Sequence, residues 1–238
     1  MKLLVSVISA EEARRALAGG ADIIDVKDPR EGALGAPSPR VLSDVVRDVG
    51  AAAPVSVALG DLPDLPNTAA LAARGASLAG AAFVKVGLRG VRDLVGAVAL
   101  MRAVADAVEP QTAVIAAAYA DAEALDPPAL APAVLPDVVA RAGVSGALID
   151  TFVKDGRGLY HWLSESELAD LIARTRRTGT SFGVAGQLAL GELRRVPADV
   201  VGLRSAVCRG GDRAGELDAE LVAAAVAELR TGSVFTQG

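Results

Sequence analysis

Short apolar segments alternate with helix-like segments along the whole chain. The apolar segments are rich in Val, Ile and Ala, which is typical of strands buried on both faces of a parallel sheet. They cover residues 3–7, 22–26, 54–59, 82–87, 113–119, 146–150, 181–186 and 199–204. The predicted helices lie near residues 10–18, 38–48, 67–79, 91–107, 133–142, 165–177, 188–194 and 216–230. This order predicts a parallel sheet in which a helix follows each strand.

Eight strand–helix repeats are the number that closes a (β/α)8, or TIM, barrel. The chain length of 238 residues is also close to the usual size of that fold. The alternative is an open, doubly wound α/β sheet, which often carries a GxGxxG motif after its first strand. No such motif follows residues 3–7, and no linker or break in composition divides the chain. We therefore predict one (β/α)8 barrel domain over residues 1–238.

Three of the predicted helices begin with residue types that favour helix N-termini. Ser9 precedes an acidic first turn, and Asn67 or Thr68 precedes a run rich in Ala and Leu. Ser164 is followed three residues later by Glu167, which is the spacing of a capping box. Side-chain oxygens at such positions accept hydrogen bonds from otherwise unpaired backbone N–H groups, so we expect helix starts there.

Charge and hydropathy exclude several classes of partner. The net charge is -5, the pI is about 5.0, and no basic tract is present, so we expect no nucleic-acid partner. The apolar stretches are interrupted by Gly, Pro or charged residues, so we expect no membrane partner. The single cysteine, Cys208, cannot form an internal disulfide. These features favour a cytoplasmic protein, and they allow a homo-oligomer.

The same composition limits the chemistry that the chain can perform. One histidine and one cysteine cannot build a zinc site of the usual Cys/His type within one chain. No dinucleotide-binding motif is present either, so we predict that neither a metal nor an organic cofactor is needed. His161 stands beside Trp162 just before a helix signal, and we interpret it as a helix-start or packing residue.

Lysine is rare in this chain, and its positions form a pattern. Of the 24 basic residues only four are lysines, which leaves 20 arginines. Lys2 is terminal, but Lys27, Lys85 and Lys154 fall at or just beyond the C-terminal ends of the second, fourth and sixth predicted strands. Alternate strands of a (β/α)8 barrel supply the same layer of inward side chains, and their C-terminal ends open on the catalytic face. We therefore expect these three lysines to meet at the mouth of the barrel.

Two aspartates belong to the same predicted cluster. Asp25 lies two residues before Lys27, on the same face of its strand, and Asp150 ends the sixth strand. Burial and neighbouring ammonium groups disfavour the charged form of a lysine and free a nucleophilic amine, while a carboxylate can hold a second lysine charged or move protons. The alternative is that the lysines lie at the rim and pair with Asp28 and Asp155.

A phosphate site is predicted from the segments that follow the last two strands. In (β/α)8 barrels these two loops often bind phosphate with backbone N–H groups. Gly186 and Gly202 would allow close approach of the backbone, and Arg204 and Ser205 would add hydrogen-bond donors. The alternative is that these are ordinary turn glycines and a rim arginine.

Several segments together resemble one known family. They are GGADIIDVKDPREGALGA, VKVGLRG, AAAYAD, LIDTFVKDGRGL and VVGLRSAVCRGGDR. In combination they are similar to the (5-formylfuran-3-yl)methyl phosphate synthases, the 4-(hydroxymethyl)-2-furancarboxaldehyde-phosphate synthases of methanofuran biosynthesis. The similarity runs from Leu3 to about Leu229. The chain departs from the family mainly in two proline-rich loops, residues 61–67 and 126–136.

The resemblance implies a (β/α)8 barrel that condenses two molecules of glyceraldehyde 3-phosphate into a phosphorylated furan aldehyde. Phosphate and water are lost, and no metal or organic cofactor takes part. The family's Schiff-base lysine falls on Lys27 and its proton-transfer lysine on Lys85. Its supporting acids fall on Asp25 and Asp150, and a further lysine falls on Lys154.

On this reading Asp25 is the charge partner of Lys27, and the loop 28–37 closes over the substrate. The enzyme would be a carbon–oxygen lyase acting on phosphates. Two alternatives remain open. One is a metal-free aldolase or decarboxylase acting on another phosphorylated sugar, and the other is an inert barrel that binds a phosphorylated metabolite.

Overall fold

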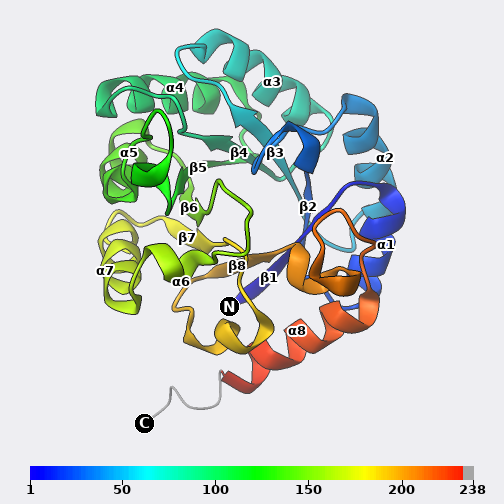
Figure 1. Ribbon diagram of the computed structural model, residues 1–238. Coiled ribbons are helices and arrows are strands. Elements are labelled where there is room, and N and C mark those ends of the chain that lie inside the picture. The colour runs from blue at the N-terminus through cyan, green and yellow to red at the C-terminus, as the bar shows by residue number, and fades with distance from the viewer. Residues whose placement is uncertain (233–238) are drawn as a thin grey trace.

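Eight parallel strands form one closed barrel in the computed structural model, which describes residues 1–232. Each strand pairs with the next, and β8 pairs with β1 to complete the ring (Figure 1). The strands are β1 (Lys2–Val7), β2 (Ile23–Val26), β3 (Val55–Asp61), β4 (Phe83–Gly87), β5 (Ala113–Tyr119), β6 (Gly146–Asp150), β7 (Ser181–Val184) and β8 (Val200–Leu203). The predicted (β/α)8 fold is confirmed and the open sheet is wrong; the last six residues of the predicted domain, 233–238, lie outside the described residues.

The helices surround the barrel and bury one face each against it (Figure 1). They are α1 (Ala10–Ala18), α2 (Pro39–Val49), α3 (Pro66–Leu78), α4 (Leu94–Ala107), α5 (Leu135–Ala142), α6 (Leu159–Trp162), α7 (Glu165–Arg176) and α8 (Ala219–Gly232). Two predicted starts are confirmed: the Ser9 hydroxyl accepts a hydrogen bond from the Glu12 N–H, and Ser164 and Glu167 form a capping box. Among residues 1–232, no helix has the length and apolar character needed to cross a membrane.

Two predicted helices differ from the structure. The third begins at Pro66 rather than at Asn67 or Thr68, and Leu65 before it provides no side-chain cap. Proline suits the first position of a helix because its φ is already helical and its missing N–H is not needed there. The segment predicted as a helix at 188–194 is a 3-10 helix at Leu190–Arg195. A glycine within it and a proline two residues after it disfavour a longer α-helix.

Large apolar side chains are exposed on one side of the molecule. Leu71 and Leu78 of α3 and Val95 of α4 are each more than half exposed. The sequence allows a homo-oligomer, and that prediction stays a prediction.

Gly87, at the end of β4, lies against a hydrogen-bonded pair of side chains, the buried Tyr119 and the half-buried Asp61. The Tyr119 hydroxyl donates to Asp61 Oδ2 at 2.9 Å. A Cβ at residue 87 would lie 1.9 Å from Asp61 Oδ1 and 2.9 Å from the Tyr119 hydroxyl oxygen. Only glycine fits without moving this pair.

We expect Gly87→Ala to lower the free energy of unfolding by about 2–4 kcal/mol, because it overpacks the site and disrupts the Asp61–Tyr119 hydrogen bond. Urea denaturation would measure the change. Gly75→Ala on α3 is the matched control, since a Cβ there meets nothing within 4 Å. It should stabilise the helix by about 0.5–1 kcal/mol. Equal effects of the two substitutions would contradict the prediction.

Candidate active site

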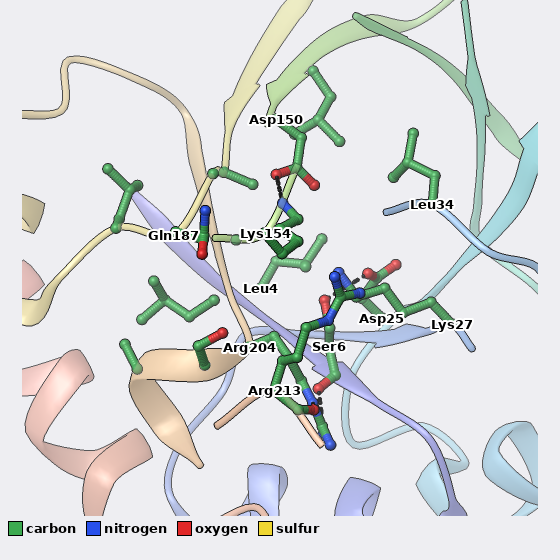
Figure 2. Close-up of a pocket in the computed structure, with 18 of the residues that line it drawn as sticks. Leu4, Ser6, Asp25, Lys27, Leu34, Asp150, Lys154, Gln187, Arg204 and Arg213 are labelled. Atoms are coloured by element: carbon green, nitrogen blue, oxygen red, sulfur yellow. Dashed lines mark hydrogen bonds and ion pairs between the residues drawn. The ribbon is translucent and has the colours of Figure 1, made fainter. Parts of the chain in front are cut away.

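A pocket opens at the C-terminal ends of the strands, where the active sites of (β/α)8 barrels lie. Asp25 belongs to β2, Lys85 to β4 and Asp150 to β6, while Lys27 follows β2 and Lys154 lies in the loop after β6. All five line this one pocket. Figure 2 shows Asp25 and Lys27 on one side of it and Asp150 with Lys154 on another. The structure thus brings together the residues of the even-numbered strands.

Asp25 and Lys85 form an ion pair on the floor of the pocket. Lys85 Nζ lies 2.6 Å from Asp25 Oδ1, and the two side chains are only 5% and 1% exposed. The Ser6 hydroxyl of β1 donates a hydrogen bond to Asp25 Oδ2 at 2.9 Å. The strand between them, β3, has the small residues Ser56 and Ala58 beside this pair, so Lys85 can reach Asp25 across it.

The charge partner of Asp25 therefore differs from the one expected. The sequence predicts that Asp25 pairs with Lys27, whereas the structure pairs it with Lys85. Lys27 lies just beyond the end of β2, closer to the mouth, and the charge of Asp25 acts on it without direct contact.

Asp150 and Lys154 form a second ion pair, nearer the mouth. Lys154 Nζ lies 2.6 Å from Asp150 Oδ1 and donates to Thr151 Oγ1 at 3.1 Å. The Thr151 N–H also donates to Asp150 Oδ1, at 2.7 Å. Burial alone would raise the pKa of Asp150, but the ammonium groups of Lys154 and Lys27 outweigh it and lower that pKa. The Asp150 carboxyl group is therefore held ionised between two lysines.

Lys27 is the lysine whose protonation the pocket alters most clearly. Its side chain is buried and makes no hydrogen bond or ion pair with any other residue in 1–232. Burial lowers its pKa to about 8, with Asp150 and Asp25 opposing the shift and Lys154 and Lys85 adding to it. At pH 7 roughly a tenth of the molecules then carry a neutral amine, far more than for an exposed lysine.

The two aspartates that could pair with these lysines at the rim form ion pairs with arginines instead. Asp28 forms an ion pair with Arg30, and Asp155 forms one with Arg157, each at 2.6 Å. The alternative in which the lysines lie at the rim and pair with Asp28 and Asp155 is therefore wrong.

The four residues predicted to bind phosphate line the same pocket as the lysines. Gly186 has a φ of +113°, and a Cβ there would lie 3.2 Å from the Thr151 backbone nitrogen, so the position favours glycine. Gly202 belongs to β8, and Ser205 opens a short 3-10 helix at Ser205–Val207. Their role in binding phosphate stays a prediction.

Arg204 also borders the pocket, but its guanidinium has other acceptors. It forms a buried, two-pronged ion pair with Glu12 of α1. It also donates to the carbonyl oxygens of Ser6, Arg213 and Gly215 at 3.1, 2.9 and 3.3 Å. Because every guanidinium N–H group faces one of these acceptors, Arg204 ties the loop after β8 to α1. Its role as a phosphate ligand remains a prediction.

Arg213 is a pocket residue that the sequence analysis did not single out. It is half-buried, and the one hydrogen bond that its guanidinium makes within residues 1–232 is a long one, 3.4 Å, to the Gly32 carbonyl oxygen. It lines the same pocket as the lysines, and the charge of Asp150 acts on its guanidinium. The only signal in the sequence was its place nine residues after Arg204 in the same glycine-rich loop, which does not tell one arginine from the other.

Two further residues shape the pocket wall. The Gln187 amide donates to the Arg157 carbonyl oxygen at 2.9 Å and accepts from the Gly156 N–H at 3.0 Å, so it joins the loops after β6 and β7. Leu34, in the loop 28–37, is 1% exposed and lines the pocket. This loop thus already covers part of the mouth, while its closure over a substrate stays a prediction.

The lone histidine lies away from the pocket. His161 is exposed in the short helix α6, and its ring packs edge-on against Trp162 with centroids 4.8 Å apart. This agrees with its interpretation as a packing residue.

Known proteins with similar sequences belong to one family. The family model described as 4-HFC-P synthase matches residues 3–226. The (5-formylfuran-3-yl)methyl phosphate synthase of Methanosarcina mazei is 41% identical and covers 97% of this chain and 100% of its own length. The synthase of the same name from Methanocaldococcus jannaschii is 42% identical, with 93% and 97% covered.

Solved structures show the same fold at low identity. Phosphoribosyl anthranilate isomerase from Thermus thermophilus superposes with a TM-score of 0.64 at 19% identity, over 97% of this chain and 99% of its own. That likeness concerns the barrel alone. From the family match and the named relatives, the chain is an enzyme and belongs to the 4-HFC-P synthase family of (5-formylfuran-3-yl)methyl phosphate synthases.

Proposed function

We propose that this enzyme condenses two molecules of glyceraldehyde 3-phosphate into (5-formylfuran-3-yl)methyl phosphate, with loss of phosphate and water, through an imine on Lys27. The observation that carries the proposal is the state of Lys27. It is a buried lysine without an ion-pair partner among residues 1–232, and its pKa is lowered to about 8. Two carboxylates and two further lysines share its pocket.

The chemistry begins with the neutral amine of Lys27, which attacks the aldehyde carbon of the first triose phosphate. Loss of water gives an imine, and its protonated form acidifies the neighbouring C–H bond. Lys85, which is paired with Asp25, carries protons to and from the substrate. Phosphate then leaves by β-elimination, an aldol-type bond joins the second triose, and dehydration gives the ring. The Asp150–Lys154 pair supplies a base and a cation at the mouth.

Substrate phosphate is bound, on this proposal, by Gly186, Gly202, Ser205 and the free guanidinium donors of Arg213. Arg213→Gln should raise KM by about 10- to 100-fold, the effect of losing a charge-assisted hydrogen bond of about 1.5–3 kcal/mol. Steady-state kinetics with glyceraldehyde 3-phosphate would measure it. Arg209→Gln, an exposed arginine in the same loop, is the control and should leave KM unchanged. An unchanged KM in Arg213→Gln would remove Arg213 from the phosphate site.

The pH dependence follows from the state of Lys27. The reactive amine is neutral, so kcat/KM should rise with pH through an apparent pKa of about 8 and level off above it. Because burial lowers this pKa, kcat/KM should rise at a lower pH than it would for an exposed lysine, whose pKa is near 10.4. A profile that is flat between pH 6 and 9, or that falls with rising pH, would contradict a nucleophilic role for Lys27.

One assay tests the reaction itself. The protein is incubated with glyceraldehyde 3-phosphate, and a furan chromophore and free phosphate are followed together. Both should appear in the same proportion throughout. Release of carbon dioxide from another phosphorylated sugar would favour the decarboxylase alternative. Binding without turnover would favour the inert barrel.

A further inference from the structure

A second cavity enters the barrel from the end opposite to the mouth. It has a volume of about 580 Å³ and begins beside Met1 and Ser181, at the N-terminal ends of the strands. Phe83 and Ile115 line the cavity and are only partly buried, whereas the interior of most (β/α)8 barrels is filled by packed side chains. Solvent can therefore enter the barrel from this end.

We call this second cavity the axial cavity. Lys85 lines both the axial cavity and the pocket at the mouth, so it lies where the two meet. The pocket at the mouth holds only about 50 Å³. The Lys85–Asp25 ion pair thus separates a narrow chamber that contains Lys27 from a wider one that leads to the other end of the barrel. A third opening, of about 370 Å³, borders Lys27 and Arg213 on the outer side of the mouth.

Two buried polar atoms beside this partition have no hydrogen-bond partner within residues 1–232. One is the hydroxyl oxygen of Ser56, which is 1% exposed and lines the axial cavity. The other is Asp25 Oδ1, which is close to Lys85 Nζ but makes no well-aligned hydrogen bond. Ser56 and Asp25 are direct neighbours in the β2–β3 register, so their side chains lie on the same face. Buried polar atoms are nearly always paired with protein groups or with ordered water.

We infer that a water molecule bound by Ser56 Oγ and Asp25 Oδ1 links Lys85 to the axial cavity, so that Lys85 exchanges protons with solvent from the N-terminal end of the barrel. The inference rests on the proposed function for the need of Lys85 to carry protons. When the Lys85 ammonium gives a proton to the substrate, the amine takes one from the bound water. That water is reprotonated along the cavity from bulk solvent, so the charge of the pair is restored.

Separate entrances solve a conflict in imine chemistry. The imine on Lys27 is hydrolysed by water, so the chamber at the mouth works best when it is closed around the substrate. Lys85 still needs a source and a sink for protons during the same turnover. A path from the other end of the barrel supplies them while a bound substrate covers Lys27 at the mouth.

The test measures how fast the ammonium hydrogens of Lys85 exchange with water. With only four lysines in the chain, lysine labelled with ¹⁵N at Nζ gives a spectrum simple enough to assign with Lys85→Met. Ser56→Val and Ser56→Thr are matched in shape and differ by one hydroxyl group. We expect exchange at Lys85 to slow by about tenfold or more in Ser56→Val and to stay near the wild-type rate in Ser56→Thr.

Two further variants identify the end from which water arrives. Gly183→Val narrows the axial cavity, and a Cβ at residue 183 would lie 3.0 Å from the flexible end of the Leu148 side chain. Ala206→Leu narrows the pocket at the mouth instead. Exchange should slow in Gly183→Val and not in Ala206→Leu. The reverse pattern, or wild-type exchange in both Ser56→Val and Gly183→Val, would overturn the inference. If Ser56→Val fails to fold, Gly183→Val decides alone.

The exchange measurement uses no substrate, so its result is independent of the proposed reaction. A protein that forms no furan can still show exchange that depends on Ser56, in which case the proposed function fails and the water path stands. In an active protein, Ser56→Val should lower kcat, enlarge the solvent deuterium isotope effect on kcat and leave KM unchanged. A purely structural role of Ser56 would not enlarge the isotope effect.

Discussion

Lys27→Arg is expected to lose at least ~10³-fold in kcat/KM, the scale of removing a covalent nucleophile. A guanidinium remains protonated and cannot form the carbinolamine that precedes an imine. This chain uses arginine for positive charge at 20 positions, so arginine would be tolerated if charge were all that residue 27 supplied. Furan formation from glyceraldehyde 3-phosphate is the measurement. Lys2→Arg, an exposed lysine at the start of β1, is the control and should keep full activity.

A second variant separates loss of chemistry from loss of folding. Arginine at this buried position keeps a charge that lysine can lose, whereas Lys27→Met resembles the neutral amine in size and should fold as the wild type does. Both should be inactive. Borohydride added with the triose phosphate should fix a substrate-derived mass on the peptide that contains Lys27. Adduct on Lys85 or Lys154 would reassign the nucleophile, and a fully active Lys27→Arg would end the imine mechanism.

Asp25→Asn should produce the second large effect, on both activity and stability. The substitution leaves the Lys85 ammonium buried without its counter-charge, which costs about 3–5 kcal/mol of unfolding free energy. We expect kcat to fall by about 10²–10⁴-fold, because Lys85 loses the ion-pair partner that holds its position. Denaturant unfolding and steady-state kinetics on one preparation would measure both quantities.

A double variant separates the loss of stability from the loss of kcat. Asp25→Asn combined with Lys85→Met removes both charges together, so most of the lost stability should return while kcat stays low. Ser6→Ala, which removes only the hydroxyl hydrogen bond to the Asp25 carboxylate, should cost about 1.5–3 kcal/mol. Recovery of activity in the double variant would show that the pair has a structural role alone.

The barrel and the residues of its pocket could be predicted from sequence because both follow from periodicity. Eight apolar runs separated by helix-like runs specify the strand order, and the rarity of lysine singles out Lys27, Lys85 and Lys154. Because the strands are parallel, the C-terminal ends of the second, fourth and sixth strands lie at the same end of the barrel, and so do these three lysines. No knowledge of individual contacts is needed for either step.

Contacts between residues far apart in the chain could not be predicted. The partner of Asp25 depends on how far Lys85 reaches across β3, and that reach depends on the small side chains of Ser56 and Ala58. Arg204 is predicted to bind phosphate because its loop has the right place and composition, and that role stays a prediction. The structure reveals a competing acceptor, Glu12, which lies 192 residues earlier in the chain. Arg213 was missed for the same reason, since the difference between the two arginines is set by their acceptors.

The Arg204–Glu12 ion pair also bears on how the chain is made. A ribosome releases α1 early, yet the cation that balances the Glu12 carboxylate comes from the last strand–helix repeat. Until that repeat emerges, burying Glu12 against β1 leaves a carboxylate unpaired, which is unfavourable. We therefore expect the first repeat to dock loosely during synthesis and the ring to close late, when nearly the full length of the polypeptide is available. Nascent chains truncated before Arg204 should accordingly be degraded readily by proteases at α1, whereas chains released after it should resist them.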